Sequence, residues 1–140
     1  MTRALALDVG SKTIGLALSD PTYLIAQAYK TLERDNLKTD LDRLEIIIAE
    51  EDVKEIVVGL PRHMNNDIGV SAQRAMSLGR ALQERTGKEV IYQDERLSTV
   101  SAERVMIERG TRREKRKEYV DALAATFILQ TWLDKKRSSR

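Results

Sequence analysis

The chain has 140 residues and no cysteine, with 41% hydrophobic and 33% charged residues. This length suits one domain over residues 1–140, and this composition is typical of a globular protein rather than a disordered one. The lack of cysteine excludes disulfides, thiolate zinc sites and a cysteine nucleophile, and it fits a cytoplasmic location. No apolar run approaches the about 20 residues that a membrane helix needs, so we expect no membrane contact.

The net charge is only +2, but basic residues are clustered. RGTRREKRK (109–117) and KKRSSR (135–140) are both strongly basic. Such clusters attract phosphate groups, which favours nucleic acid as a partner. A solvated loop and a solvated tail are the alternative interpretation of the same two runs.

The first third of the chain predicts three strands and a helix. ALALDVGSKTIGLALSD (4–20) reads as a hairpin, in which Gly10 supplies a positive φ or a close backbone approach within the turn. A weaker third strand is predicted near Ile25–Thr31. From Leu37 to Ile48, apolar residues recur at helical spacing, which predicts an amphipathic helix.

The remaining chain alternates strands and helices. The predicted elements are a strand at Glu55–Pro61, a helix around Ala72–Leu82 that stops at Thr86-Gly87, a strand at Glu89–Arg96, a helix at Ser98–Arg109 capped by Gly110, a basic loop, and a helix at Glu118–Lys135. Antiparallel strands followed by alternating strands and helices predict an α/β fold with a mixed sheet covered by helices.

Three carboxylates stand where apolar packing is expected. Asp8 ends the first apolar run, Glu95 ends VIYQDE, and Asp121 shares a helix face with Ala125 and Ile128. Each has a structural explanation by itself: a turn residue, an ion pair with a neighbouring base, and an anion in a first helical turn. If all three converge, their repulsion calls for a cation, and oxygen ligands suit Mg²⁺ or Mn²⁺. Two such ions can drive phosphodiester hydrolysis.

Four stretches carry a resemblance to a known family. They are ALDVGSKTIGLALSD (6–20), VVGLP (57–61), DERLSTVSAE (94–103) and KEYVDALAATFILQTWL (117–133). In order and spacing the chain resembles the YqgF/RuvX family, whose members are described as Holliday junction resolvases or pre-16S rRNA nucleases. The resemblance implies a ribonuclease H-like fold: a five-stranded mixed sheet, its first three strands antiparallel, with helices on both faces.

The resemblance also implies roles for single residues. Asp8, Glu95 and Asp121 would be the catalytic, metal-binding triad, with two Mg²⁺ or Mn²⁺ ions. Residues that would contact the nucleic acid are Lys12, Arg96, Ser98, Thr99, Arg112, Arg113, Lys115, Arg116 and Lys117. The chain departs from relatives at Thr13, where Arg is common, and in the stretch RHMNNDIG (62–69), which holds the only histidine, His63.

The carboxylates and basic runs favour a metal-dependent endonuclease acting on structured nucleic acid, and the resemblance implies pre-16S rRNA or Holliday junctions as its substrate. Junction resolution makes two symmetric cuts and would require a homodimer. With one Trp, four Tyr and one Phe, recognition of backbone and shape is favoured over base stacking. A non-catalytic nucleic-acid-binding module and, more remotely, an actin-like nucleotide-binding protein are the alternative functions.

Overall fold

The computed structural model describes residues 2–60, 69–94 and 113–138, and within the last helix it describes the side chains of 122–137. The elements in chain order are β1 (Arg3–Val9), β2 (Thr13–Ser19), β3 (Ala26–Glu33), α1 (Leu37–Glu50), β4 (Val53–Leu60), α2 (Val70–Thr86), β5 (Glu89–Asp94) and α4 (Arg113–Ser138). The helix predicted at Ser98–Arg109 lies outside the described residues. No helix in the described ranges is long and apolar enough to span a bilayer.

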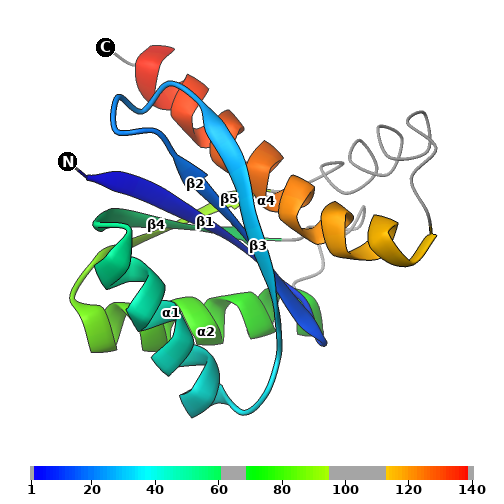
Figure 1. The fold of residues 1–140 in the computed structure, drawn as a ribbon. Coiled ribbons are helices and arrows are strands. Elements are labelled where there is room, and N and C mark those ends of the chain that lie inside the picture. The colour runs from blue at the N-terminus through cyan, green and yellow to red at the C-terminus, as the bar shows by residue number, and fades with distance from the viewer. Residues whose placement is uncertain (1, 61–68, 95–112, 139–140) are drawn as a thin grey trace.

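The five strands form one mixed sheet in the order β3-β2-β1-β4-β5. The first three strands are antiparallel neighbours, while β4 is parallel to both β1 and β5. Helices α1 and α2 lie on one face of this sheet, and α4 crosses the other (Figure 1). The predicted fold class is therefore confirmed. Because β1, β4 and β5 run in the same direction, their carboxyl ends meet at one edge.

The two sheet faces differ in the size of their side chains. Along β1, Leu5 and Leu7 are fully buried in the core beneath α1 and α2, whereas Ala4 and Ala6 face α4. This period of two is what the strand sequence predicts. The alanines leave room for Ile128 and Leu129 of α4, which are 1% and 0% exposed.

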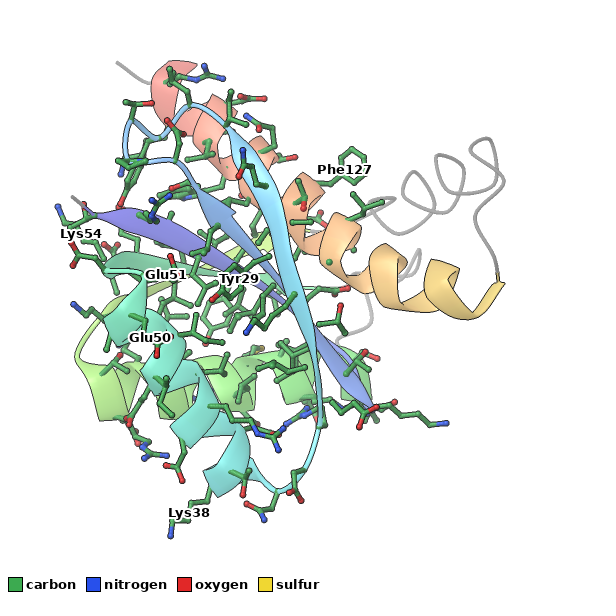
Figure 2. The ribbon with its side chains drawn as sticks, viewed as in Figure 1. Tyr29, Lys38, Glu50, Glu51, Lys54 and Phe127 are labelled. Atoms are coloured by element: carbon green, nitrogen blue, oxygen red, sulfur yellow. The ribbon has the colours of Figure 1, made fainter. Side chains whose placement is uncertain are left out.

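Helices α1 and α2 match the predicted segments. The Asn36 side chain accepts a hydrogen bond from the Thr39 amide at 2.8 Å, which caps the start of α1. Helix α2 ends at Gly87, whose φ of +69° suits a glycine C-terminal cap. Strand β3 is tied to α1 because the Tyr29 hydroxyl donates to Glu51, which directly follows that helix (Figure 2).

The prediction of a loop is wrong for the second half of the basic run 109–117. Helix α4 begins at Arg113, five residues before the predicted start at Glu118, so Arg113–Lys117 is helical. Arg, Lys and Glu have high helix propensity, and the lack of apolar periodicity in this stretch hid its helical state. Part of the basic run therefore forms the first turn and a half of α4.

A side-chain amide links α4 to the segment between β2 and β3. Gln130 accepts a hydrogen bond from the Ala26 amide at 2.9 Å and donates to the Leu24 carbonyl at 3.0 Å. The Gln130 side chain thus bonds to the backbone as a neighbouring strand would. It fixes the edge of the sheet to the helix that crosses it.

Replacing Gln130 tests this link. We expect Gln130→Ala to lower the free energy of unfolding by about 1–2 kcal/mol, because the partly buried Ala26 amide loses its acceptor. Urea unfolding measures the change. Thr131→Ala is the matched control, since that exposed hydroxyl bonds only within the helix, to the Phe127 carbonyl. Equal stability of the two variants would contradict the assigned role of Gln130.

The turn after β2 generates a prediction about pH. The Ile25 amide and the Thr22 hydroxyl, followed by the Leu24 and Thr22 amides, hold the pKa of the Asp20 carboxyl below its ordinary value of 3.8. An ionised Asp20 therefore stabilises the fold above that pH, and this stabilisation fades as pH falls through the depressed pKa. Asp20→Asn should be less stable than wild type at neutral pH, with a gap that narrows in acid. Urea unfolding across pH measures the gap, and a gap that widens in acid would contradict the assignment.

Candidate active site

Asp8 lies near the carboxyl end of β1, at the center of the sheet. It is half-buried, and its neighbour on β2 is Gly15. On the other side, Leu7 pairs with Val58, so continuing the register by one residue brings Asp8 level with Gly59 of β4. A glycine therefore flanks Asp8 on both neighbouring strands. Alternation with Ala4 and Ala6 directs Asp8 to the face that α4 covers.

A row of polar and glycine residues crosses the sheet at this level. Gly15 pairs with Thr31 of β3, and Gly59 pairs with Gln93 of β5. Gln93 is buried, with 7% of its surface exposed, although it is polar. The row Thr31, Gly15, Asp8, Gly59 and Gln93 carries no large apolar side chain. The row has a carboxylate at its center, and a hydroxyl and a side-chain amide at its two ends.

The last turns of α4 lie over the amino ends of the parallel strands, because Lys136 bonds to Glu55 at the start of β4. From there the helix crosses the sheet obliquely (Figure 1). Asp121 lies on this helix one turn before Ala125, which is fully buried against the sheet. Asp121 thus lies close along α4 to the residues that contact the sheet.

The hairpin turn beside Asp8 is held by a buried ion pair. The Gly10 amide donates to the Thr13 carbonyl at 2.8 Å, and a Cβ on Gly10 would stand 3.0 Å from that oxygen. Close approach therefore explains this glycine; the alternative expectation of a positive φ is wrong. Arg34 donates to the Gly10 carbonyl at 3.1 Å and pairs with Asp40 at 3.1 Å. Asp40 is 2% exposed.

Lys12 is held by the same residue, Arg34, whose contacts with Gly10 and Asp40 we call the clamp. Its side chain is exposed, and its carbonyl accepts a hydrogen bond of 2.8 Å from the Arg34 amide. The turn therefore presents a cation at the carboxyl edge of β1, close in sequence to Asp8. A phosphate group approaching Asp8 from this edge would meet Lys12.

Several predicted site residues are not described at the level of their side chains. Glu95, Arg96, Ser98, Thr99 and Arg112 lie outside the described residues, as does His63. For Asp121, Arg113, Lys115, Arg116 and Lys117 only the place on α4 is described. Among the described side chains, no group of three acids or histidines is close enough to hold a metal ion. The structure thus describes one member of the predicted triad in full.

Sequence reasoning missed three contributors to this region. Gln93 had a signal, since it is a polar residue at the inward position of β5, two residues after Ile91. Asp40 had one too, because it is an acid next to Leu41 on the apolar face of α1. Gly59 becomes informative only through its register with Asp8.

Residues 2–135 match a family model described as "RuvX: Holliday junction resolvase". A protein of Agathobacter rectalis is 50% identical over 99% of both chains, and one of Lactococcus lactis subsp. cremoris is 46% identical over 94% of both. Each carries the description "Putative pre-16S rRNA nuclease".

Two solved structures share the fold at low identity. Thermus thermophilus RuvC in complex with a Holliday junction substrate has a TM-score of 0.64 at 14% identity, covering 99% of this chain and 98% of that one. The Fowlpox virus resolvase in complex with Holliday junction DNA has a TM-score of 0.63 at 9% identity, covering 96% and 98%. At these identities the likeness concerns the fold alone.

The clamp on the hairpin turn can be tested by unfolding. Arg34→Met should cost about 3 kcal/mol, because it leaves the Asp40 carboxylate buried without its cation. Adding Asp40→Asn should recover part of this loss, since a neutral amide is cheaper to bury and its oxygen can still accept from the Asp35 amide. Urea unfolding of both variants makes the comparison. A double variant less stable than Arg34→Met would contradict the clamp.

Proposed function

This chain belongs to the RuvX family, and we propose that it is a metal-dependent endonuclease that processes the 5′ region of pre-16S rRNA. Near-full-length relatives at 46–50% identity carry the description "Putative pre-16S rRNA nuclease", which supports this substrate. The observation that carries the chemistry is Asp8, a carboxylate in the middle of a sheet with a glycine on each neighbouring strand.

The residues at this position fit a divalent cation. Carboxylate and amide oxygens are the donors that Mg²⁺ and Mn²⁺ prefer, and the row through Asp8 supplies both kinds. A half-buried carboxylate on the face that carries the apolar packing of α4 favours binding of a cation. Gly15 and Gly59 keep the adjacent positions free of side-chain atoms. Asp8 is thus suited to hold a metal ion against the sheet.

We assign Glu95 and Asp121 as the other two members of the triad. Along β5 the side chains alternate, with Gln93 buried and Asp94 exposed. If this alternation continues by one residue, Glu95 returns to the face of Asp8. Asp121 lies on α4 one turn before Ala125, which is buried against the sheet face to which Asp8 points. The bound cations would activate water and stabilise the leaving oxygen of the phosphodiester.

The phosphate backbone would be bound by cations around this edge. Lys12 extends from the β1–β2 turn, and the basic run 109–117 leads into α4. We assign phosphate contacts to Lys12, Arg96, Arg112, Arg113, Lys115, Arg116 and Lys117, with Ser98 and Thr99 as hydroxyl donors. Binding of this kind weakens steeply with salt, because each neutralised phosphate releases counterions.

Resolution of Holliday junctions is the second candidate, favoured by the description of the matching family model. Two symmetric cuts in a four-way junction need two active sites related by a two-fold axis. This candidate therefore predicts a homodimer, whereas trimming of rRNA does not. The two functions therefore differ in the oligomeric state that they require, which can be measured on the protein itself.

Asp8→Asn tests the proposed chemistry. We expect this variant to lose cleavage of a labelled pre-16S rRNA 5′ fragment by at least about 100-fold while it keeps binding that RNA, because only a cation ligand is removed. Cleavage is measured with Mg²⁺ or Mn²⁺ and again after chelation, beside a mobile four-way DNA junction. Binding is measured by filter retention.

Asp94→Asn is the matched control, since it removes a carboxylate at the same edge whose side chain is exposed on the other side of the strand. It should cleave as wild type does. Paired nicks in the junction, lost in Asp8→Asn, would replace the rRNA assignment with junction resolution. Binding of both substrates with no metal-dependent cleavage of either would overturn the nuclease proposal and favour a binding module.

A further inference from the structure

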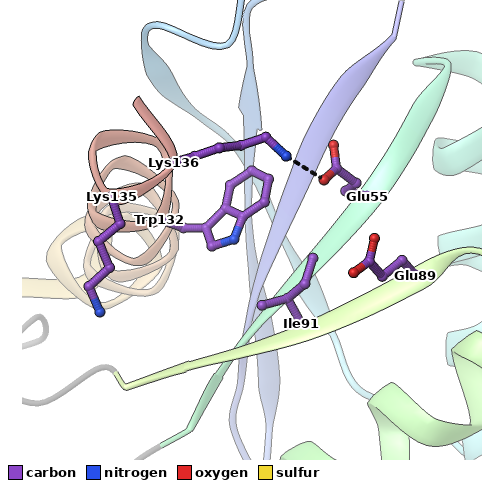
Figure 3. Close-up of a pocket in the computed structure, with 6 residues that line it drawn as sticks. All are labelled: Glu55, Glu89, Ile91, Trp132, Lys135 and Lys136. Atoms are coloured by element: carbon purple, nitrogen blue, oxygen red, sulfur yellow. Dashed lines mark hydrogen bonds and ion pairs between the residues drawn. The ribbon is translucent and has the colours of Figure 1, made fainter. Parts of the chain in front are cut away.

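A second feature of the α4 face is a pocket at the opposite end of the sheet from Asp8. It has a volume of about 430 Å³, is open to solvent, and is lined by Glu55, Glu89, Ile91, Trp132, Lys135 and Lys136. We call it the Trp132 pocket (Figure 3). Its size lies within the about 300–1,000 Å³ typical of small-molecule sites. None of these residues belongs to the proposed triad or its phosphate contacts.

One wall of the pocket is an aromatic ring held in place by its surroundings. Trp132 stacks obliquely on Tyr23, with ring centroids 6.3 Å apart, and the Lys136 ammonium lies 4.9 Å from the indole centroid. Lys136 is anchored in turn by the buried Glu55 carboxylate at 3.1 Å. Burial raises the pKa of the Tyr23 hydroxyl to about 12, and the Glu55 carboxylate adds to the rise. Tyr23 and Lys136 therefore hold the indole in place where it lines the pocket.

The opposite wall of the pocket carries an acid that is exposed, unlike the buried Glu55. Glu89, at the start of β5, is exposed and borders the pocket across from Trp132 (Figure 3). The pocket therefore combines an aromatic ring, a solvent-facing carboxylate and two lysines of α4, of which Lys136 lies over the ring. A flat ligand with hydrogen-bond donors on one edge and a negative charge nearby matches all three features. A nucleotide has this chemistry.

The pocket is connected to the candidate active site along one strand. Glu89, Ile91 and Gln93 are alternate residues of β5 and share the face toward α4. Ile91 is about 7 Å and Glu89 about 13 Å from Gln93 along the strand. A short stretch of single-stranded RNA cut near Asp8 would reach the Trp132 pocket by following β5.

We propose that the Trp132 pocket is a subsite for one unpaired guanine of the RNA substrate. This proposal rests on the proposed nuclease function. The base stacks on Trp132, and Glu89 accepts hydrogen bonds from the two adjacent donors of the guanine Watson–Crick edge, which no other base presents. Lys135 and Lys136 face the flanking phosphates. The sequence favours backbone recognition, and this pocket adds one position at which a base is read.

The chain contains a single tryptophan, so its fluorescence reports on this pocket alone. The experiment uses the full Asp8→Asn chain, which should bind RNA without cutting it. The probes are a short oligouridine with one central guanosine and its all-uridine counterpart. We expect the guanosine RNA to quench Trp132 and to bind about tenfold more tightly. N-acetyltryptophanamide with the same RNAs corrects for collisional quenching.

Glu89→Gln, made in the same background, should reduce the tenfold preference to about twofold or less. Glu84→Gln is the matched control, since Glu84 is an exposed acid on α2, on the other face of the sheet, and should leave the preference unchanged. Equal binding of the two RNAs, or a preference that survives Glu89→Gln, would overturn the proposal. Guanosine monophosphate binding as tightly as the guanosine RNA would also overturn it, because the pocket would then serve a free nucleotide.

This readout is independent of cleavage. Guanosine-dependent quenching without any cleavage by the wild-type chain would contradict the proposed nuclease function and support an RNA-binding pocket. Metal-dependent cleavage without such quenching would contradict the proposed guanine subsite and support the proposed nuclease function. The two proposals therefore fail in distinguishable ways.

Discussion

The packing of α4 against the alanine face of β1 and β2 places this helix on the side of the sheet to which Asp8 points. Alanines at alternate positions of these strands leave room above the sheet, so Ile128 and Leu129 of the helix reach it and are almost fully buried. Lys136, near the end of α4, bonds to Glu55, so this end of the helix lies over the beginnings of the parallel strands. The Trp132 pocket lies at these beginnings, whereas Asp8 lies near the carboxyl end of β1.

Charged residues have different surroundings at the two ends of the parallel strands. At the carboxyl edge, Asp8 lies between glycines, and the nearby turn is held by Arg34 through its pair with the buried Asp40. A carboxylate with open space beside it is suited to a cation that arrives from solution. At the other end the buried Glu55 is paired with Lys136. That pair immobilises an aromatic ring, and the ring offers a surface to a neutral, flat group.

The arrangement also explains why a fold of this kind suits a nuclease. Asp8 is the last residue but one of the central strand, and the strands on both sides carry glycine at the same level, so a phosphodiester could approach Asp8 without meeting bulky side chains there. Hydrogen bonds from Gln130 to the backbone of residues 24 and 26 hold α4 against the edge strand. A fixed helix is needed because two strands and one helix would supply the three acids.

The sequence by itself determined the strands and helices, because the alternation of Leu and Ala along β1 and the helical spacing in α1 and α2 are local patterns. It also singled out Asp8, an acid at the end of an apolar strand. It misjudged the start of α4, where residues 113–117 are helical without an apolar face. Only the tertiary structure decided that Gly59 is level with Asp8, that Arg34 reaches the Gly10 carbonyl, and that Trp132 lies across from Glu89. These relations depend on strand register and helix direction, which arise from contacts between residues far apart in the chain and leave no local pattern in the sequence.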